Sequence, residues 1–224
     1  MFPFSFLRNT SEDKQRLKKY REYRHLGETL TLEVIKAYMD NQAIQSVGRI
    51  FGVSQKNKML LENEEERNFI MDFLLNEYQQ QGQTFIQRYL HEHPELAGSE
   101  AEVLEGYLNS YISLFKIVAT NPKNSTLTFA NLLQDQPEIE IVNINLSRTA
   151  IPGLLIFSRV TPMKDFNTLS GMFAIFNNIP ERTILKQTKV LMKKVKSERE
   201  STRLFVAMFK LNRQQGLSVH EKDV

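Results

Sequence analysis

Apolar residues recur at three- and four-residue spacing from Ser11 to Thr120, and this pattern predicts helices almost throughout that range. Short polar, glycine or proline breaks divide the helices from one another. A first predicted helix is capped by Thr10, runs to about His25 and is ended by Gly27. A second helix is predicted from Thr29 to Met39, with its apolar residues on one face.

Cap residues position the next helices. Asp40 is typical of the first residue of a helix that ends at Gly52. Asn63, with Glu66 three residues later, resembles a capping box and predicts a deeply packed helix after it. The same apolar spacing returns from Gln83 to His93, where a proline follows and stops the helix.

A further capping box, formed by Ser99 and Glu102, predicts a helix that continues to about Thr120. Its apolar residues at helical spacing are Leu104, Leu108, Tyr111, Phe115 and Val118. Burying each of these side chains stabilises the fold by roughly 1.5–3 kcal/mol, so we expect a core helix.

The pattern changes after Pro122, where short β-rich pieces are separated by proline, glycine and asparagine turns. The predicted strands are Thr126–Phe129, Ile139–Asn145, Leu154–Val160 and Leu169–Phe176. Residues 127–133 also fit a short helix. Such a unit is a small antiparallel sheet or a barrel, too small to be very stable alone, so we expect it to rest on helices.

The segment from Ile179 to Arg213 concentrates positive charge, with ten basic residues against three acidic ones. The whole chain has a net charge of +3, so the remainder is acidic on balance. Its apolar residues follow helical spacing and predict either one long basic helix or a pair broken near Ser197, where Glu200 completes a capping box. We expect this segment to brace the two preceding parts.

These elements predict an α+β protein with a helical domain at residues 1–122 and a small β domain at residues 123–178. An amphipathic basic helix or helix pair follows at residues 179–213, and residues 214–224 form a flexible tail. Hydrophobic content of 41% and charged content of 25% are those of a globular protein. No apolar run approaches the roughly 18 residues of a transmembrane helix, and the apolar start is too short for a signal peptide.

The chain has no cysteine, which favours a cytoplasmic setting and excludes a disulfide framework and thiolate ligands. His91 and His93 form the densest group of metal-binding residue types, but neighbours two apart do not share a helix face. We therefore predict no metal and no cofactor. No catalytic motif is present either, and Ser170-Gly171 is typical of a turn or bulge.

Residues 42–63 partly resemble a helix-turn-helix, in which Gln55 to Lys58 would begin the recognition helix. Lys58 falls on a position that is normally apolar in that motif. The preferred interpretation is a helix that ends at Gly52 and is followed by a polar loop.

Three functions follow from these patterns. We prefer a cytoplasmic protein-interaction or regulatory module, self-associating through apolar residues of the last segment, namely Leu191, Val195, Phe205 and Phe209. The alternative is nucleic-acid binding by a basic stripe comprising Lys186, Lys189, Lys193, Lys194, Lys196, Arg199 and Arg203, with Lys56 and Lys58. An enzyme of unidentified class, without assignable catalytic residues, is the third. The stripe could instead be neutralised by acidic residues such as Glu62, Glu66 and Asp72.

Overall fold

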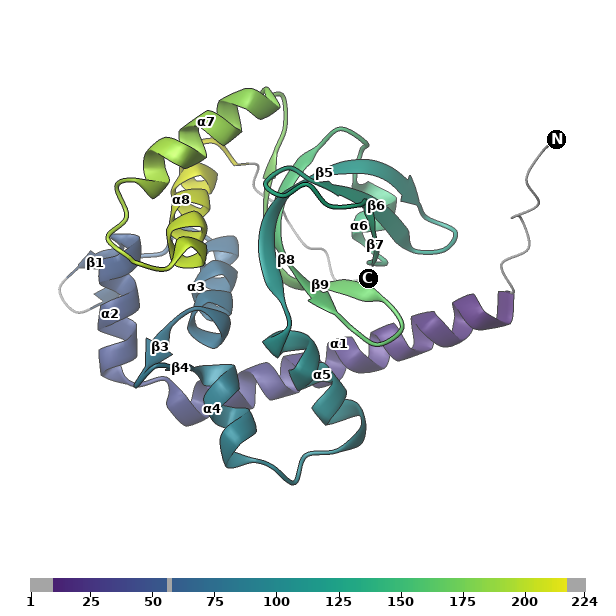
Figure 1. Ribbon diagram of the computed structural model, residues 1–224, viewed down its shortest axis with the longest axis horizontal. Coiled ribbons are helices and arrows are strands. Elements are labelled where there is room, and N and C mark those ends of the chain that lie inside the picture. Colours follow the sequence, from purple (N-terminus) through teal and green to yellow (C-terminus); the bar gives the residue numbers. More distant parts are fainter. Residues whose placement is uncertain (1–9, 56–57, 217–224) are drawn as a thin grey trace.

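The computed structural model describes residues 10–55 and 58–216 and is an α+β protein, as predicted (Figure 1). The helices of its first part are α1 (Thr10–Tyr38), α2 (Asn41–Phe51), α3 (Glu64–Asn76), α4 (Phe85–Glu92) and α5 (Gly98–Leu108). Two short antiparallel ribbons lie between them: β1 (Ser54–Gln55) with β2 (Lys58–Met59), and β3 (Gln79–Gln80) with β4 (Gln83–Thr84).

The predicted caps of the early helices are largely confirmed. The Asp40 side chain accepts a hydrogen bond from the backbone N–H of Ala43 at 2.7 Å, and Gly52 ends α2 with a φ of 73°. Asn63 accepts from the backbone N–H of Glu66 at 2.9 Å. The Glu66 carboxylate accepts from the Glu62 backbone instead of the Asn63 backbone, so this capping box is only half formed.

Helix α1 corrects the prediction that a helix ends at Gly27, because it continues for 29 residues through that glycine. A Cβ at Gly27 would collide with the Tyr107 hydroxyl of α5, so glycine allows the two helices to approach closely. Tyr23 before it and Leu30 after it are both buried in the same core. Packing on both sides of the glycine therefore outweighs its helix cost of about 1 kcal/mol.

The predicted helix from Ser99 to Thr120 is wrong in its second half. Helix α5 stops at Leu108, and the chain continues as strand β5 (Tyr111–Asn121). Residues 111–120 are rich in β-branched and aromatic types, which pack well on a pleated surface. Their apolar spacing fits the period of a helix as well as that of a strand. Ser99 is not a cap either, because its hydroxyl donates to Glu22 of α1 while α5 begins without a side-chain cap.

The β unit is a closed barrel of β5 with β6 (Thr126–Asn131), β7 (Ile139–Val142), β9 (Asn167–Phe176) and β8 (Leu155–Pro162), in that order around the barrel. The short helix α6 (Leu146–Thr149) follows β7. The pairs are antiparallel except for β7 with β9, which is parallel. The order β8-β5-β6-β7 is a Greek key, and a five-stranded Greek-key barrel is also the architecture of the OB-fold.

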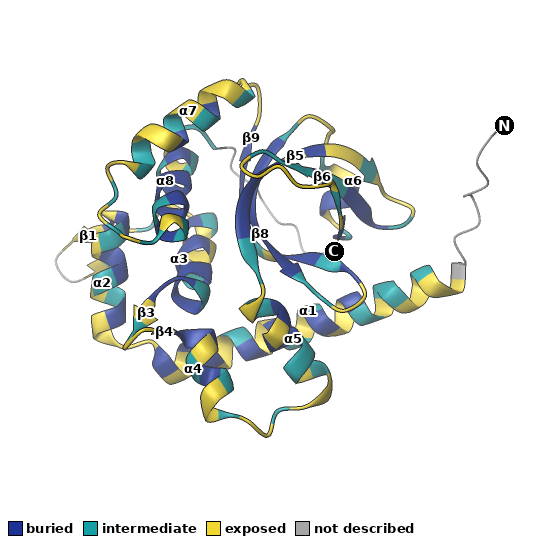
Figure 2. Ribbon diagram, in the orientation of Figure 1, coloured by how far each residue is buried: buried dark blue, intermediate teal, exposed yellow. Residues whose placement is uncertain are grey.

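The barrel begins before the expected boundary at residue 122, since β5 is one of its strands. One core, including Phe115 and Phe129, fills its interior. A second core lies between the barrel's outer face and the helices, and the residues of α1, α3 and α8 belong to it (Figure 2). The barrel therefore rests on helices, as its size requires.

The last segment forms two helices, α7 (Glu181–Met192) and α8 (Glu200–Gln215). The chain breaks near Ser197, as the second alternative predicts, but Ser197 makes no capping bond to α8, whose N-cap residue is Arg199. Phe205 of α8 lies beside Phe51 of α2, Phe69 of α3 and Phe157 of β8, with ring centroids 5.5–6.1 Å apart. The predicted role of a brace is thus fulfilled by α8.

Candidate functional site

A cleft of about 1180 Å³ is lined by residues of α7, α8 and their connection and by residues of α3, α4, α5 and the start of β5. It is more than twice the volume of three other cavities in the described part of the chain, which measure about 530, 400 and 390 Å³. Both sides are held in place by the core between the barrel and the helices, since Leu204 of α8 and Ile112 of β5 line the cleft and also belong to that core.

A buried ionic network forms the floor of this cleft. Arg159 of β8 donates from Nε to Asp72 at 2.7 Å and from Nη2 to Glu77 at 3.0 Å. Ser170 donates to the second oxygen of Asp72 at 2.6 Å. A bulge in β9, where Gly171 has a φ of 94°, lies opposite Arg159 and confirms the expected irregularity at Ser170-Gly171.

The same network ties the connection between α7 and α8 to α3. Arg199 donates to the Glu77 carboxylate at 3.1 Å and to the Glu77 backbone carbonyl. Ser201 donates to the same carboxylate oxygen at 2.8 Å. Burial opposes the charge of Arg159, but Asp72 and Glu77 outweigh it and hold the pKa of Arg159 above its usual value. The charges at the floor are therefore matched.

Apolar side chains form part of the cleft walls, among polar ones such as Gln79, Ser113 and Thr188. The apolar and aromatic residues of the lining include Ile86, Leu108, Tyr111, Ile112, Leu133, Leu185, Met192, Val195 and Leu204. Two of these side chains are exposed to solvent, Leu108 to 49% and Leu133 to 36%. Burial raises the pKa of Tyr111, because the charged phenolate is disfavoured away from water.

The rim on the side of α7 and α8 carries positive charge. Lys189 and Lys193 are exposed, and neither forms an ion pair with any residue of the described ranges. Arg203 donates to the backbone carbonyls of Ser197 and Glu198 at 2.8 and 2.9 Å. It therefore holds the connection between α7 and α8 against α8 and pairs with no carboxylate among the described residues. The cleft thus joins a neutralised floor, apolar walls and a basic rim.

A family model described as "Family of unknown function (DUF7986)" matches residues 14–222. The chain belongs to this family. Comparisons with curated proteins and with solved structures found no match. The family description carries no ligand or activity, so the function of this member is inferred from its cleft.

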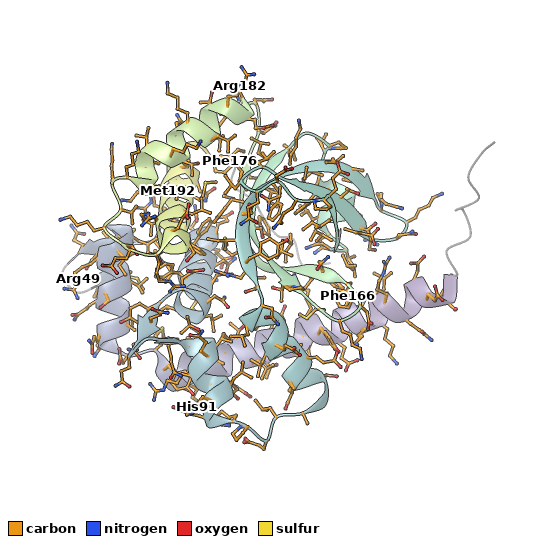
Figure 3. The ribbon with its side chains drawn as sticks, viewed as in Figure 1. Arg49, His91, Phe166, Phe176, Arg182 and Met192 are labelled. Carbon is orange, nitrogen blue, oxygen red and sulfur yellow. The ribbon has the colours of Figure 1, made fainter. Side chains whose placement is uncertain are left out.

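The structure separates the predicted nucleic-acid residues into two groups. Five lysines, all exposed and without an ion pair among the described residues, lie on α7 and the connection after it: Lys186, Lys189, Lys193, Lys194 and Lys196. Arg199 is neutralised by Glu77, and Arg203 bonds to backbone carbonyls. Figure 3 shows Arg182 at the outer edge of α7, extending the lysine group toward the start of the helix.

The partial resemblance to a helix-turn-helix is wrong. After Gly52 the chain forms the ribbon of β1 and β2 instead of a recognition helix, and Lys58 is an exposed residue of β2. Lys56 lies outside the described residues. The interpretation of a helix ending at Gly52 is the correct one, although a short ribbon replaces the simple loop.

The residues expected to mediate self-association lie at different depths. Phe205 and Phe209 are 0% and 1% exposed and pack inside this chain, where a partner cannot reach them. Leu191 and Val195 are half-buried, and Val195 lines the cleft. Only the last two therefore offer any surface to another molecule.

His93 pairs with Glu95 at 3.0 Å on the surface beyond α4. Within residues 10–55 and 58–216, no three metal-binding side chains come together, and no helix has the length and apolar character needed to cross a membrane.

Sequence reasoning missed the ionic network of Asp72, Glu77 and Arg159. Its one sequence signal is Arg159, the only charged residue in the predicted strand Leu154–Val160, whose other residues except Ser158 are apolar. A charge at such a position has to find a buried partner.

Proposed function

We propose that this protein is a cytoplasmic protein-interaction module whose cleft binds a segment of a partner protein. The observation that carries the proposal is the exposure of Leu108 and Leu133 on the walls of a cleft of about 1180 Å³. Both side chains line the same cleft, and exposed apolar residues gathered at one surface are typical of interaction sites. The cytoplasmic setting rests on the absence of cysteine.

The dimensions and lining of the cleft favour a polypeptide segment. Its volume exceeds the roughly 300–1,000 Å³ of ordinary small-molecule pockets. Aliphatic walls that include Leu185, Met192 and Val195 suit aliphatic side chains of a partner, and the flexible thioether of Met192 adapts to their shape.

The chemistry of the floor supports binding in preference to catalysis. Both oxygens of Asp72 and both oxygens of Glu77 accept hydrogen bonds from Arg159, Arg199 or serine hydroxyls. A carboxylate engaged in this way is a poor general base, because its lone pairs are already occupied. The network instead fixes the shape of the cleft.

The test is selection of binders from a displayed library of random peptides, with the full chain immobilised. We expect enriched peptides that lose binding in the variants Leu108→Glu and Leu133→Glu, because each places a charge against an apolar ligand surface. Ile151→Glu is the matched control, since Ile151 is an exposed apolar residue (65%) that does not line the cleft.

Enrichment of no peptide, or of peptides that bind both cleft variants as well as the original chain, contradicts the proposed function. Circular dichroism of each variant establishes that the fold is intact. The exposure of the substituted side chains predicts that it will be.

A further inference from the structure

We propose that the segment bound in the cleft is acidic and amphipathic, with carboxylates directed to α7 and the connection after it and apolar side chains directed to the wall of α5 and β5. This inference rests on the proposed function and specifies the chemistry of the partner. It is carried by the distribution of charge around the cleft.

Five cationic and two anionic side chains line the cleft. Arg159 and Arg199 at the floor are matched by the buried carboxylates of Asp72 and Glu77. The uncompensated charges are then Lys189, Lys193 and Arg203 on the rim, against the exposed Glu200. A ligand that supplies carboxylates there completes the pairing that the described part of the chain leaves open.

The exposed lysines and the exposed leucines of the lining come from different elements, and the buried or half-buried Leu185, Met192 and Leu204 line the cleft on the side of α7 and α8 as well. Lys189 lies on α7 and Lys193 is the residue that caps its end, about one turn or 6 Å further along the helix axis. Leu108 ends α5, and Leu133 follows β6. A segment with acidic side chains along one edge and apolar side chains along the other satisfies both sides at once, whereas a nucleic-acid backbone satisfies only the basic side.

The surroundings of the rim strengthen its attraction for an acidic segment. Arg182, Lys186, Lys194 and Lys196 are also exposed and have no carboxylate partner among the described residues. Like-signed charges around a cleft raise the local concentration of an oppositely charged ligand and speed its association. Binding is therefore expected to weaken as salt increases.

The experiment compares two synthetic peptides, one built from glutamate and leucine and the other from lysine and leucine in the same order. Their binding to the full chain is measured by fluorescence anisotropy at low salt. We expect the acidic peptide to bind at least tenfold more tightly, because each 1.4 kcal/mol of differential interaction changes affinity by about tenfold. The double variant Lys189→Glu and Lys193→Glu should reverse that preference.

The matched control is the double variant Lys18→Glu and Lys123→Glu, which changes net charge equally at exposed sites outside the cleft. It should keep the preference for the acidic peptide. Lys189→Gln with Lys193→Gln, which removes charge without reversing it, should bind both peptides weakly.

Failure of this inference differs from failure of the proposed function. If the displayed peptides depend on Leu108 but are neutral or basic, the inference of an acidic partner is wrong, whereas the proposed function as an interaction module still holds. A single-stranded oligonucleotide that binds more tightly than the acidic peptide, and equally well to Leu108→Glu, overturns the inference in favour of nucleic acid.

Discussion

Helices α7 and α8 are neighbours in sequence and share a basic, amphipathic composition, yet they differ in depth and in charge pairing. Eight residues of α8 are buried, whereas only Ile184 and Thr188 are buried in α7 (Figure 2). Arg213 at the end of α8 forms an ion pair with Glu66 of α3. The lysines of α7 have no such pair among the residues that the structure describes.

The comparison shows that the positive charge of the last segment has two physical roles. The paired cations are arginines, whose planar guanidinium groups can hold a buried carboxylate with two bonds. Most of the cations without a carboxylate partner among the described residues are lysines, whose strongly hydrated ammonium groups stay in water, and Arg182 and Arg203 are the exceptions. Net charge alone does not distinguish these roles, because both add equally to the sum.

The largest expected contrast concerns Phe205 of α8. Phe205→Ala should lower the free energy of unfolding by about 3–5 kcal/mol, because it empties space among the rings of Phe51, Phe69 and Phe157. Val190→Ala on α7, where the side chain is 48% exposed, should cost less than about 0.5 kcal/mol. Urea unfolding followed by circular dichroism measures both, and equal losses would break the comparison.

An intermediate effect is expected at Arg213. Its Nε and Nη2 donate to the two oxygens of Glu66 at 2.6 and 2.7 Å, and Glu66 is only 1% exposed. Arg213→Met should therefore cost about 1.5–3 kcal/mol, since it leaves a buried carboxylate with a backbone donor alone. Arg182→Met on α7 is the control and should leave the urea midpoint nearly unchanged.

The double variant Glu66→Met with Arg213→Met sharpens this result. Removing both partners should recover part of the lost stability, because an apolar pair can replace a buried ion pair. If the double variant is less stable than Arg213→Met, the carboxylate of Glu66 stabilises the fold without Arg213.

Local sequence signals were sufficient for much of this fold. Asp40 and Gly52 mark the two ends of α2, and they could be recognised in the sequence because helix caps depend on a few adjacent residues. The junction of α5 and β5 could not be located, since the apolar residues from Tyr111 to Val118 fit helical spacing while their final state depends on pairing with β6 and β8. Continuation of α1 through Gly27 likewise depends on Tyr107, which is distant in sequence.

The candidate site was predicted less completely than the fold. The lysines of α7 stood out in the sequence, but their separation from the paired arginines required knowing where Glu66 and Glu77 lie. The cleft joins α5 to α7, which are some 70 residues apart, so no local pattern could reveal it. Contacts between residues distant in sequence determine both the pairing of the arginines and the position of the cleft.

The smallest expected effect concerns the lysines themselves. Lys186 and Lys189 on α7 and Lys193 at its C-cap stand three and four residues apart, a spacing at which like charges destabilise a helix by about 0.2–0.5 kcal/mol per pair. Replacing all three with glutamine relieves that repulsion but loses attraction to the negative end of the helix. The free energy of unfolding should therefore change by less than about 0.5 kcal/mol at low salt, and the change should shrink at high salt.

Urea unfolding at two salt concentrations checks this expectation, and Arg213→Met is the counterpart whose larger loss should persist in salt because Glu66 is buried. A loss above about 1 kcal/mol in the glutamine variant would mean that these lysines stabilise the fold. An unchanged stability together with lost binding of the acidic peptide would instead assign their charge to the ligand. Cations that contribute nothing to folding remain available to an anionic partner, and that property distinguishes α7 from α8.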